Sequence, residues 1–251
     1  MMQAFFSPLG ERHLERILRA RPLLALDFDG TLAPLVDDPD HACATPAVTH
    51  LLEQISQHLP IAVISGRSLP DLAQRLDFKP QHLIGEHGAA EDGRTPFPTP
   101  KALRALRVTL STEQEKLRKL GIRCEDKPHS LSLHYRTAAN PQQAHAALEQ
   151  LLNGLDPSLR IQHGKMVFNV VDRFAADKGA ALRQLMALHH YERAIYVGDD
   201  ENDETAFAAL GSEDISLRVG RDKPDSHALF WLNEQPEMAN FLTYLLQELQ
   251  A

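Results

Sequence analysis

The chain has 251 residues, of which 43% are hydrophobic and 24% are charged, so it can bury a substantial core. Its 26 basic and 34 acidic residues give a net charge of −8, which argues against a nucleic-acid partner. Its two cysteines, Cys43 and Cys124, are far apart, which argues against a disulfide framework or a thiolate zinc site. No apolar run reaches the roughly 18–20 residues needed to cross a membrane, so we expect a cytoplasmic protein with no membrane partner.

From the first residues onward, helical patterns alternate with short apolar runs. The helical patterns cover Glu11–Arg19, Pro46–Leu59, Leu69–Leu76 and Lys178–His189. The apolar runs cover Leu23–Leu26, Ile61–Ile64, His82–Ile84 and Ala194–Val197. Each run is apolar on both faces, which is typical of a parallel strand covered by helices on both sides. The pattern predicts an α/β fold with a doubly wound, Rossmann-like parallel sheet, whose ligand crevice lies beyond the carboxyl ends of the strands.

The middle of the chain follows another pattern, which begins at a proline-punctuated connector, Thr95–Pro100. The elements predicted after it are a helix (Ala102–Leu120), two strands (Ile122–Asp126 and Ser130–Tyr135), a helix (Pro141–Asn153) and two strands (Leu159–His163 and Met166–Val171). Polar and apolar residues alternate in these strands, which indicates an antiparallel sheet with one buried face. We therefore expect an inserted α/β domain with the order αββαββ at residues 97–174, and a core domain made of residues 1–96 and 175–251.

Carboxylates follow two of the predicted core strands directly. Asp27 and Asp29 come after the first strand, and Asp199 and Asp203 belong to an acidic segment after the last. Buried carboxylates at this edge of a sheet are costly unless a cation offsets their charge, and Mg²⁺ prefers carboxylate and phosphate oxygens. A simple turn explains Asp27-x-Asp29 equally well by itself, and a solvated helix start tolerates acidic residues. The density of the second acidic segment favours a metal site.

Two further segments are suited to holding an anion. Ser65, Gly66 and Arg67 follow the second core strand and offer a hydroxyl and backbone N–H groups. Lys178 opens a predicted helix, where a bound phosphate would relieve its conflict with the helix dipole. The alternatives are an ordinary turn at Ser-Gly and a solvated lysine.

Taken together and in this order, these segments resemble the motifs of the haloacid dehalogenase-like (HAD) phosphatase superfamily, with the inserted domain as its α/β cap. Within it the chain is most similar to the trehalose-6-phosphate phosphatase family. The resemblance spans nearly the whole chain and rests on Asp27-Phe28-Asp29-Gly30-Thr31, Ser65-Gly66-Arg67, Gly85-x-His87-Gly88, Glu125-x-Lys127, Leu133-His134-Tyr135-Arg136, Gly164-Lys165 and Gly198-Asp199-Asp200-x-x-Asp203-Glu204.

The resemblance implies a Mg²⁺-dependent hydrolysis of trehalose 6-phosphate. Asp27 would be the nucleophile that forms an aspartyl-phosphate, and Asp29 the general acid and base. Ser65 and Lys178 would hold the phosphoryl oxygens. The metal would be held by Asp27, the backbone carbonyl of Asp29 and Asp199, while Asp203 would complete the site by orienting a metal-bound water or Lys178.

The resemblance also implies the substrate contacts. Thr31 and Gly66 are expected at the phosphate, and Arg67, Glu125 and Lys127 at the sugar. Asn169 stands where the family has a sugar-binding glutamate, and Ala90 stands in place of the glutamate of the family's His-Gly-x-Glu segment. We expect a monomer whose partner is the sugar phosphate, with a cap that closes on hinges at Thr95–Pro100 and Asp172–Asp177.

Several other functions share parts of this pattern. A HAD phosphatase acting on another glycosyl phosphate, or a sugar phosphomutase, would use the same core residues. A response-regulator receiver also combines an acidic pocket, a phosphorylated Asp, a Ser/Thr and a Lys, but it explains neither the second domain nor Asp27-x-Asp29. A non-catalytic regulatory domain usually lacks the nucleophile or the metal acids, and here all are present.

Overall fold

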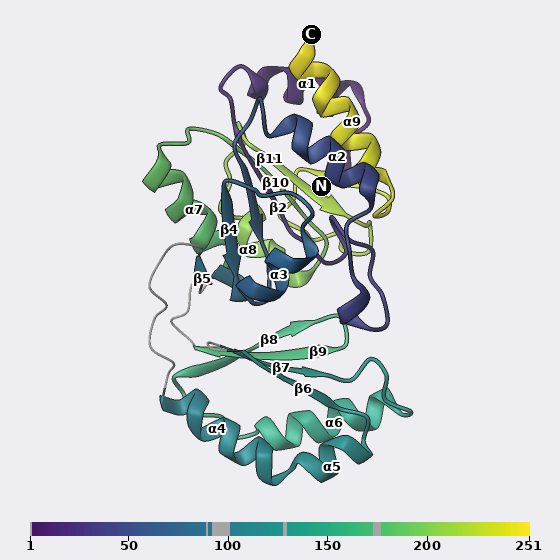
Figure 1. The fold of residues 1–251 in the computed structure, drawn as a ribbon, viewed down its shortest axis with the longest axis vertical. Coiled ribbons are helices and arrows are strands. Elements are labelled where there is room, and N and C mark those ends of the chain that lie inside the picture. The colour runs from purple at the N-terminus through teal and green to yellow at the C-terminus, as the bar shows by residue number, and fades with distance from the viewer. Residues whose placement is uncertain (1, 89, 92–100, 128–129, 173–176) are drawn as a thin grey trace. The chain divides into compact units, whose positions relative to one another are not determined.

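The computed structural model describes residues 2–88, 90–91, 101–127, 130–172 and 177–251 (Figure 1). The chain divides into two compact units, which we call the core unit (Met1–Arg94 with Ala176–Ala251) and the cap unit (Thr95–Ala175). Of the predicted hinges, residues 95–100 and 173–176 lie outside the described residues.

The core unit is built on one sheet, with the described strands in the order β1-β12-β11-β10-β2-β3-β4-β5. These strands are β1 (Gln3–Ala4), β2 (Leu23–Leu26), β3 (Ile61–Ile64), β4 (His82–Gly85), β5 (Ala90–Glu91), β10 (Ala194–Gly198), β11 (Ile215–Val219) and β12 (Phe230–Leu232). Neighbouring strands are parallel except β4 and β5. The predicted parallel α/β sheet is thus confirmed, with its four apolar runs as β2, β3, β4 and β10.

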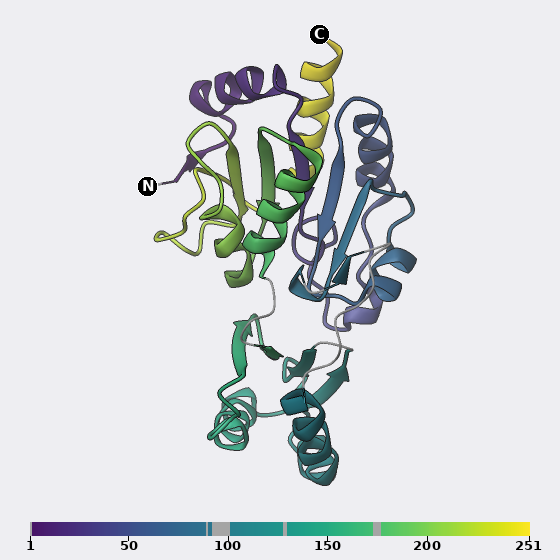
Figure 2. The ribbon, with the colours of Figure 1, turned by 90° about the vertical axis from the view of Figure 1, so that its left-hand side faces the viewer.

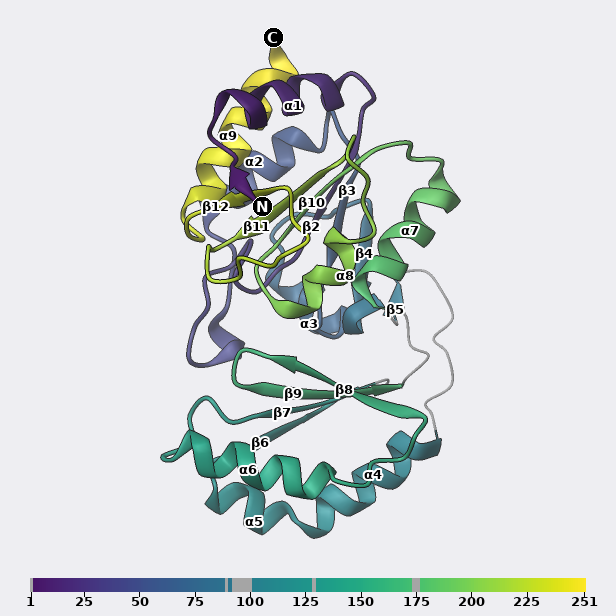
Figure 3. The ribbon, with the colours of Figure 1, turned by 180° about the vertical axis from the view of Figure 1, so that it is seen from behind.

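Helices cover both faces of this sheet (Figures 1 and 2). They are α1 (Pro8–Leu18), α2 (Pro46–Ile55), α3 (Leu69–Arg75), α7 (Lys178–His189), α8 (Glu204–Phe207) and α9 (Glu237–Gln250), with the 3-10 turns η1 (Pro39–His41), η2 (Glu86–Gly88) and η3 (Glu201–Asp203). Leu24 and Leu26 pack on the side of α1, α2 and α9, and Leu23 and Ala25 pack on the side of α7 and α8. Figure 3 shows α1 beside α9. No helix in the part of the chain that is described has the length and apolar character required to cross a membrane.

The cap unit consists of an antiparallel sheet with helices on one face (Figure 1). Its strands, in the order β6-β7-β9-β8, are β6 (Arg123–Asp126), β7 (Ser130–His134), β9 (Val167–Asp172) and β8 (Leu159–Gly164). Its helices are α4 (Lys101–Thr112), α5 (Gln114–Lys119) and α6 (Pro141–Leu152). Leu131, Leu133 and Phe168 join the apolar cluster under the helices. Because side chains alternate along a strand, Ser132 and Asn169 belong to the opposite face.

The first cap helix differs from the prediction, because two helices, α4 and α5, replace the single helix expected over Ala102–Leu120. The break falls at Glu113, directly after Ser111 and Thr112. Their hydroxyl groups donate to the carbonyls of Val108 and Thr109, both at 2.7 Å. Such hydroxyl bonds compete with the helical pattern and bend it, which explains the interruption.

Candidate active site

Three adjacent strands bring the predicted core residues to one edge of the sheet. Asp27 follows β2, Ser65 follows β3 and Asp199 follows β10. Leu26 is in register with both Val63 and Val197, so the three strands end at the same level. The strands are parallel, and this carboxyl edge is where ligands bind in open α/β sheets.

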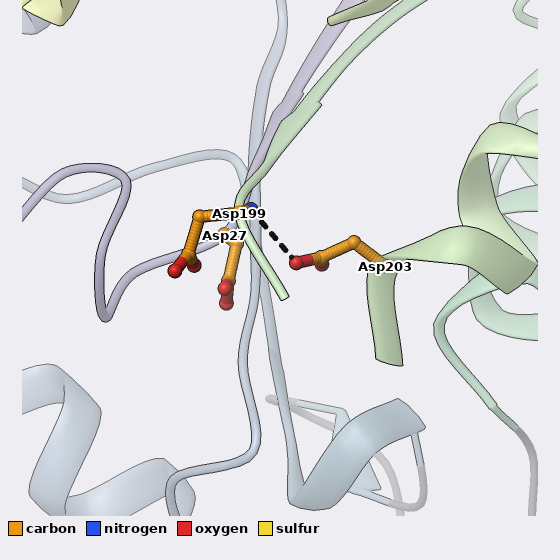
Figure 4. Close-up of side chains that lie close together, drawn as sticks. All are labelled: Asp27, Asp199 and Asp203. Carbon is orange, nitrogen blue, oxygen red and sulfur yellow. Dashed lines mark hydrogen bonds between the residues drawn. The ribbon is translucent and has the colours of Figure 1, made fainter. Parts of the chain in front are cut away.

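Three carboxylates form a buried cluster at this edge (Figure 4). Asp27, Asp199 and Asp203 are 4%, 2% and 0% exposed, and each offers an oxygen within 4.8 Å of the others. Glycine makes room for this cluster at two positions. A Cβ on Gly30 would lie 2.2 Å from Oδ2 of Asp199, and a Cβ on Gly198 would lie 2.3 Å from Cγ of Asp203.

Lys178 is the buried cation of this cluster. It begins α7, where Asp177 caps the helix, and its side chain is 1% exposed. Its Nζ lies 2.8 Å from Oδ1 of Asp27 and 2.7 Å from Oδ1 of Asp203. Burial opposes its charge, but Asp203 and Asp27 raise the pKa of Lys178 above its ordinary value, so it remains an ammonium ion.

Asp27 lies in a strongly perturbing environment. Burial raises the pKa of Asp27 well above its ordinary value; Lys178 opposes this rise, and Asp203 and Asp199 add to it. The carboxylate therefore needs more positive charge nearby than Lys178 supplies. Strongly perturbed carboxylates in such positions are typical of functional sites.

Asp203 is held by four hydrogen bonds. Its Oδ1 accepts from Lys178 and from the Tyr196 hydroxyl, at 2.7 Å each. Its Oδ2 accepts from the backbone N–H groups of Asp199 (3.0 Å) and Asp200 (2.9 Å). These contacts fit a residue that orients Lys178 and the Asp199 segment. The sequence reasoning missed Tyr196, although a tyrosine inside a buried apolar strand signals a hydroxyl that needs a partner.

Asp29 and Arg67 form a bidentate ion pair. Nε of Arg67 donates to Oδ2 of Asp29 and an Nη donates to Oδ1, at 2.7 Å each. Arg67 also contacts Asp71, which in turn pairs with Arg75. Arg67 was expected to contact the sugar, whereas its guanidinium here binds protein groups. Asp71 and Arg75 were also missed, although the spacing of four residues between them in α3 is a signal for an ion pair along a helix.

The remaining predicted phosphate contacts lie on neighbouring loops. Ser65 is buried, and its Oγ accepts from the backbone N–H of Arg67 at 3.2 Å. Gly66 lies between these two residues. Thr31 is fully buried, and its hydroxyl makes no hydrogen bond to the residues that the structure describes. A buried hydroxyl of this kind is suited to a ligand oxygen.

The donor set of the cluster fits Mg²⁺. Carboxylate oxygens are the ligands that this ion prefers. Of the three buried carboxylates, Asp27 and Asp203 pair with the buried ammonium group of Lys178, so a divalent cation would balance the remaining negative charge of the cluster. The side chain of Asp29 is occupied by Arg67, which leaves its backbone carbonyl as the expected ligand.

The cap unit carries a polar cluster of its own on the face opposite its helices. Glu125, Ser132 and Asn169 are cross-strand neighbours. The Ser132 hydroxyl donates to Oδ1 of Asn169 (2.7 Å) and accepts from Nζ of Lys127 (3.3 Å), which also lies 3.4 Å from Oε2 of Glu125. Burial opposes ionisation of Glu125, but the His134 hydrogen bond and the charge of Lys127 lower the pKa of Glu125 to about 2. Glu125 is therefore ionised and can accept hydrogen bonds from hydroxyl groups.

The sequence and the fold of this chain were compared with those of known proteins. The sequence matches the trehalose-phosphatase family over residues 25–228. A curated trehalose-phosphate phosphatase of Mycobacterium marinum is 32% identical over 244 residues, covering 91% of this chain and 62% of that relative, so the chain spans less than two thirds of the relative's length. The C-terminal domain of C. albicans trehalose-6-phosphate phosphatase shares the fold with a TM-score of 0.84, 21% identity and coverage of 98% of both chains. A haloacid dehalogenase-like hydrolase of B. subtilis shares it with a TM-score of 0.63, 18% identity and coverage of 88% and 99%. The expected HAD fold is confirmed, and the chain belongs to the trehalose-phosphatase family.

Proposed function

We propose that this protein is a Mg²⁺-dependent phosphatase that converts trehalose 6-phosphate into trehalose and inorganic phosphate. The observation that carries the proposal is the buried cluster of Asp27, Asp199, Asp203 and Lys178 at the carboxyl edge of the sheet. Membership of the trehalose-phosphatase family supports the choice of substrate.

In the first step the Asp27 carboxylate attacks the phosphorus atom. A bond forms between an Asp27 oxygen and phosphorus, and the bond from phosphorus to the sugar oxygen breaks. Asp29, in its protonated form, gives its proton to the departing sugar oxygen. Trehalose leaves, and Asp27 carries the phosphoryl group.

In the second step water attacks the phosphorus of the aspartyl-phosphate. Asp29, now a carboxylate, takes the proton of this water, the bond from Asp27 to phosphorus breaks, and inorganic phosphate is released. Lys178 faces Asp27 and is placed to hold a phosphoryl oxygen. Ser65, Gly66 and Thr31 are proposed to hold the others.

The metal-binding residues are proposed to be Asp27, Asp199 and the backbone carbonyl of Asp29. When bound, Mg²⁺ neutralises negative charge on the phosphoryl oxygens. Asp203 holds Lys178 and the backbone of Asp199 in place.

The cap is proposed to select the sugar through Glu125, Lys127 and Asn169. Glu125 accepts hydrogen bonds from hydroxyl groups, Lys127 donates them, and the Asn169 amide does both. We propose that the core domain comprises residues 1–96 and 175–251 and the cap residues 97–174, a proposal supported by the division of the chain into two compact units.

The test is phosphate release across a panel of sugar phosphates, with Mg²⁺ and with excess chelator. We expect the highest kcat/KM for trehalose 6-phosphate, and none of the panel to be hydrolysed under chelation. Preference for another glycosyl phosphate would overturn the substrate. Isomerisation of a sugar phosphate without phosphate release would identify a phosphomutase instead.

A further inference from the structure

The Arg67 guanidinium is buried and committed to protein groups. Arg67 is 7% exposed, and its Cζ atom lies 5.5 Å from the centre of the Phe28 ring. Four hydrogen bonds use its N–H groups: two to Asp29 at 2.7 Å, one to Asp71 at 2.7 Å and one to the carbonyl of Pro39 at 2.8 Å. A guanidinium has five N–H groups, so little of it remains for a substrate.

Arg67 is in turn held by α3 and by the loop that contains η1. Asp71 accepts from Arg67 with one oxygen and from Arg75 with the other, at 2.7 and 2.8 Å. Arg75 donates to the carbonyls of Asp40 (2.7 Å) and Ala42 (3.2 Å). A continuous series of polar contacts therefore runs from Asp29 to the 39–42 loop, with Arg67 at its centre.

We propose that Arg67 is a positioning residue that fixes the orientation of the Asp29 carboxyl group for proton transfer to the leaving oxygen, and that Asp71 holds Arg67 in place. The inference rests on the proposed function, in which Asp29 is the general acid. Two parallel N–H···O bonds fix both the position and the plane of a carboxylate. Each Asp29 oxygen accepts one of them and keeps a second lone pair, which can bind the proton that Asp29 gives to the leaving oxygen. The side chain is 37% exposed, so it can reach a substrate while paired.

Substrates that contain no sugar distinguish the positioning of Asp29 by Arg67 from a contact between Arg67 and the sugar. An alkyl phosphate has a poor leaving group, so its hydrolysis depends on proton donation by the general acid. The leaving group of p-nitrophenyl phosphate is good, so its hydrolysis depends little on the general acid. The value of kcat/KM is suited to the comparison because it covers the steps up to departure of the leaving group. The test compares the kcat/KM of both compounds for the wild type and Arg67→Lys, which keeps the charge but loses the planar fork.

For Arg67→Lys we expect kcat/KM to fall about 100-fold for the alkyl phosphate and less than about fivefold for the aryl phosphate, in line with the usual size of general acid catalysis. Equal losses for both compounds would overturn the proposal, because they would indicate a phosphate contact or a damaged fold. Unchanged values for both, with a raised KM for trehalose 6-phosphate only, would also overturn it and show that Arg67 binds the sugar. Arg118→Lys, at an exposed ion pair with Glu115 in α5, is the matched control.

Asp71→Asn provides an independent test should Arg67→Lys fail to fold. It leaves both partners of the Asp29–Arg67 pair in place and weakens the support of Arg67, so we expect a smaller loss, about tenfold, again selective for the alkyl phosphate. An unselective loss would contradict the proposal. A wild type that hydrolyses both simple phosphates but not trehalose 6-phosphate would refute the proposed substrate and leave this inference standing.

Discussion

At the scale of single residues, Asp199 can approach Asp27 because position 30 has no side chain. Gly30 has a φ of +81°, and a Cβ there would lie 2.2 Å from the Asp199 carboxylate. We predict that Gly30→Ala displaces Asp199 and raises the Mg²⁺ concentration for half-maximal phosphate release by at least about tenfold, the equivalent of about 1.4 kcal/mol. A Mg²⁺ titration of phosphatase activity measures this.

Gly154→Ala is the control for backbone strain. Gly154 has a similar φ of +83°, and apart from Gly154 and its two neighbours in the chain, no described residue has an atom within 4 Å of the point that a Cβ would occupy there. Both variants should lose about 1–2 kcal/mol of stability from the left-handed backbone. Only Gly30→Ala should change the Mg²⁺ requirement, and equal requirements in the two variants would refute the role given to Gly30.

By the family resemblance, Asn169 is expected to stand in the place of a sugar-binding glutamate. It is 6% exposed, and its Oδ1 accepts from Ser132. An ionised carboxylate accepts hydrogen bonds from hydroxyl groups more strongly than an amide does. Lys127, which also donates to the Ser132 hydroxyl, would balance the negative charge of a glutamate at position 169. We predict that Asn169→Glu lowers KM for trehalose 6-phosphate about tenfold, or ~1.4 kcal/mol, without changing hydrolysis of an aryl phosphate.

The matched control is Asn169→Gln, which has the length of glutamate and no charge. Steady-state kinetics should show no fall in KM for this variant. A similar fall in both variants would assign the effect to side-chain length. A rise in KM with glutamate would mean that Asn169 selects a different sugar phosphate.

At the scale of elements, the continuous apolar runs of the core and the alternating strands of the cap were predictable, whereas β11 was not. The runs that became β2, β3, β4 and β10 are apolar on both faces, and their ends gave the places of Asp27, Ser65 and Asp199. β11 was missed because Ser216 and Arg218 interrupt its apolar residues. Both are nevertheless buried: Ser216 accepts from the Leu229 N–H, and Arg218 pairs with Glu204. Such partners depend on tertiary packing, which a local pattern does not contain.

The direction of long side chains could not be predicted from the sequence either. The position of Arg67 after β3 was correct, but a flexible side chain of this length can reach a sugar or a neighbouring carboxylate. In the structure the guanidinium points to the carboxylates of Asp29 and Asp71, partners that become available to it only through the fold.

The contact between β4 and α7 provides a pH-dependent element. His82 in β4 lies 2.9 Å from the Tyr191 hydroxyl, and its ring centre lies 4.4 Å from that of His189. Burial, and then the neighbouring His189, lower the pKa of His82 to about 4 from an ordinary value of 6.5. Between these two pH values the unfolded chain binds a proton that the folded chain does not, so the free energy of unfolding falls as the pH falls through this window.

We predict that His82→Gln reduces this loss. Between pH 7.5 and pH 5 the variant should lose less stability than the wild type by about 1 kcal/mol, a value discounted because the ring is partly solvated. Denaturant unfolding at the two pH values measures it. His41→Gln, at a histidine whose side chain is 80% exposed, should behave as the wild type, and an unaltered pH dependence in His82→Gln would contradict the assignment.

At the scale of the whole molecule, the net negative charge of the chain means that positive charge for a phosphate ester has to come from the site itself. The chain carries a net charge of −8, and a phosphate ester is also anionic, so the overall field does not attract the substrate. In the proposed function the positive charge is local and comes from Lys178 and from a divalent cation proposed to bind beside Asp27 and Asp199. The sugar-binding role is proposed for the polar cluster of the cap, in which Lys127 and Glu125 are paired.

The most direct test of this account measures trehalose and inorganic phosphate together, after the purified protein is mixed with trehalose 6-phosphate. We predict equimolar release of both products by the wild type with Mg²⁺, and none in excess chelator. Asp27→Asn, a nearly isosteric change that removes the nucleophile, should keep the unfolding midpoint close to that of the wild type and release neither product. The control Asp77→Asn, at an exposed aspartate, should match the wild type. Phosphate release by Asp27→Asn at the wild-type rate, or full activity in excess chelator, would contradict the central claim.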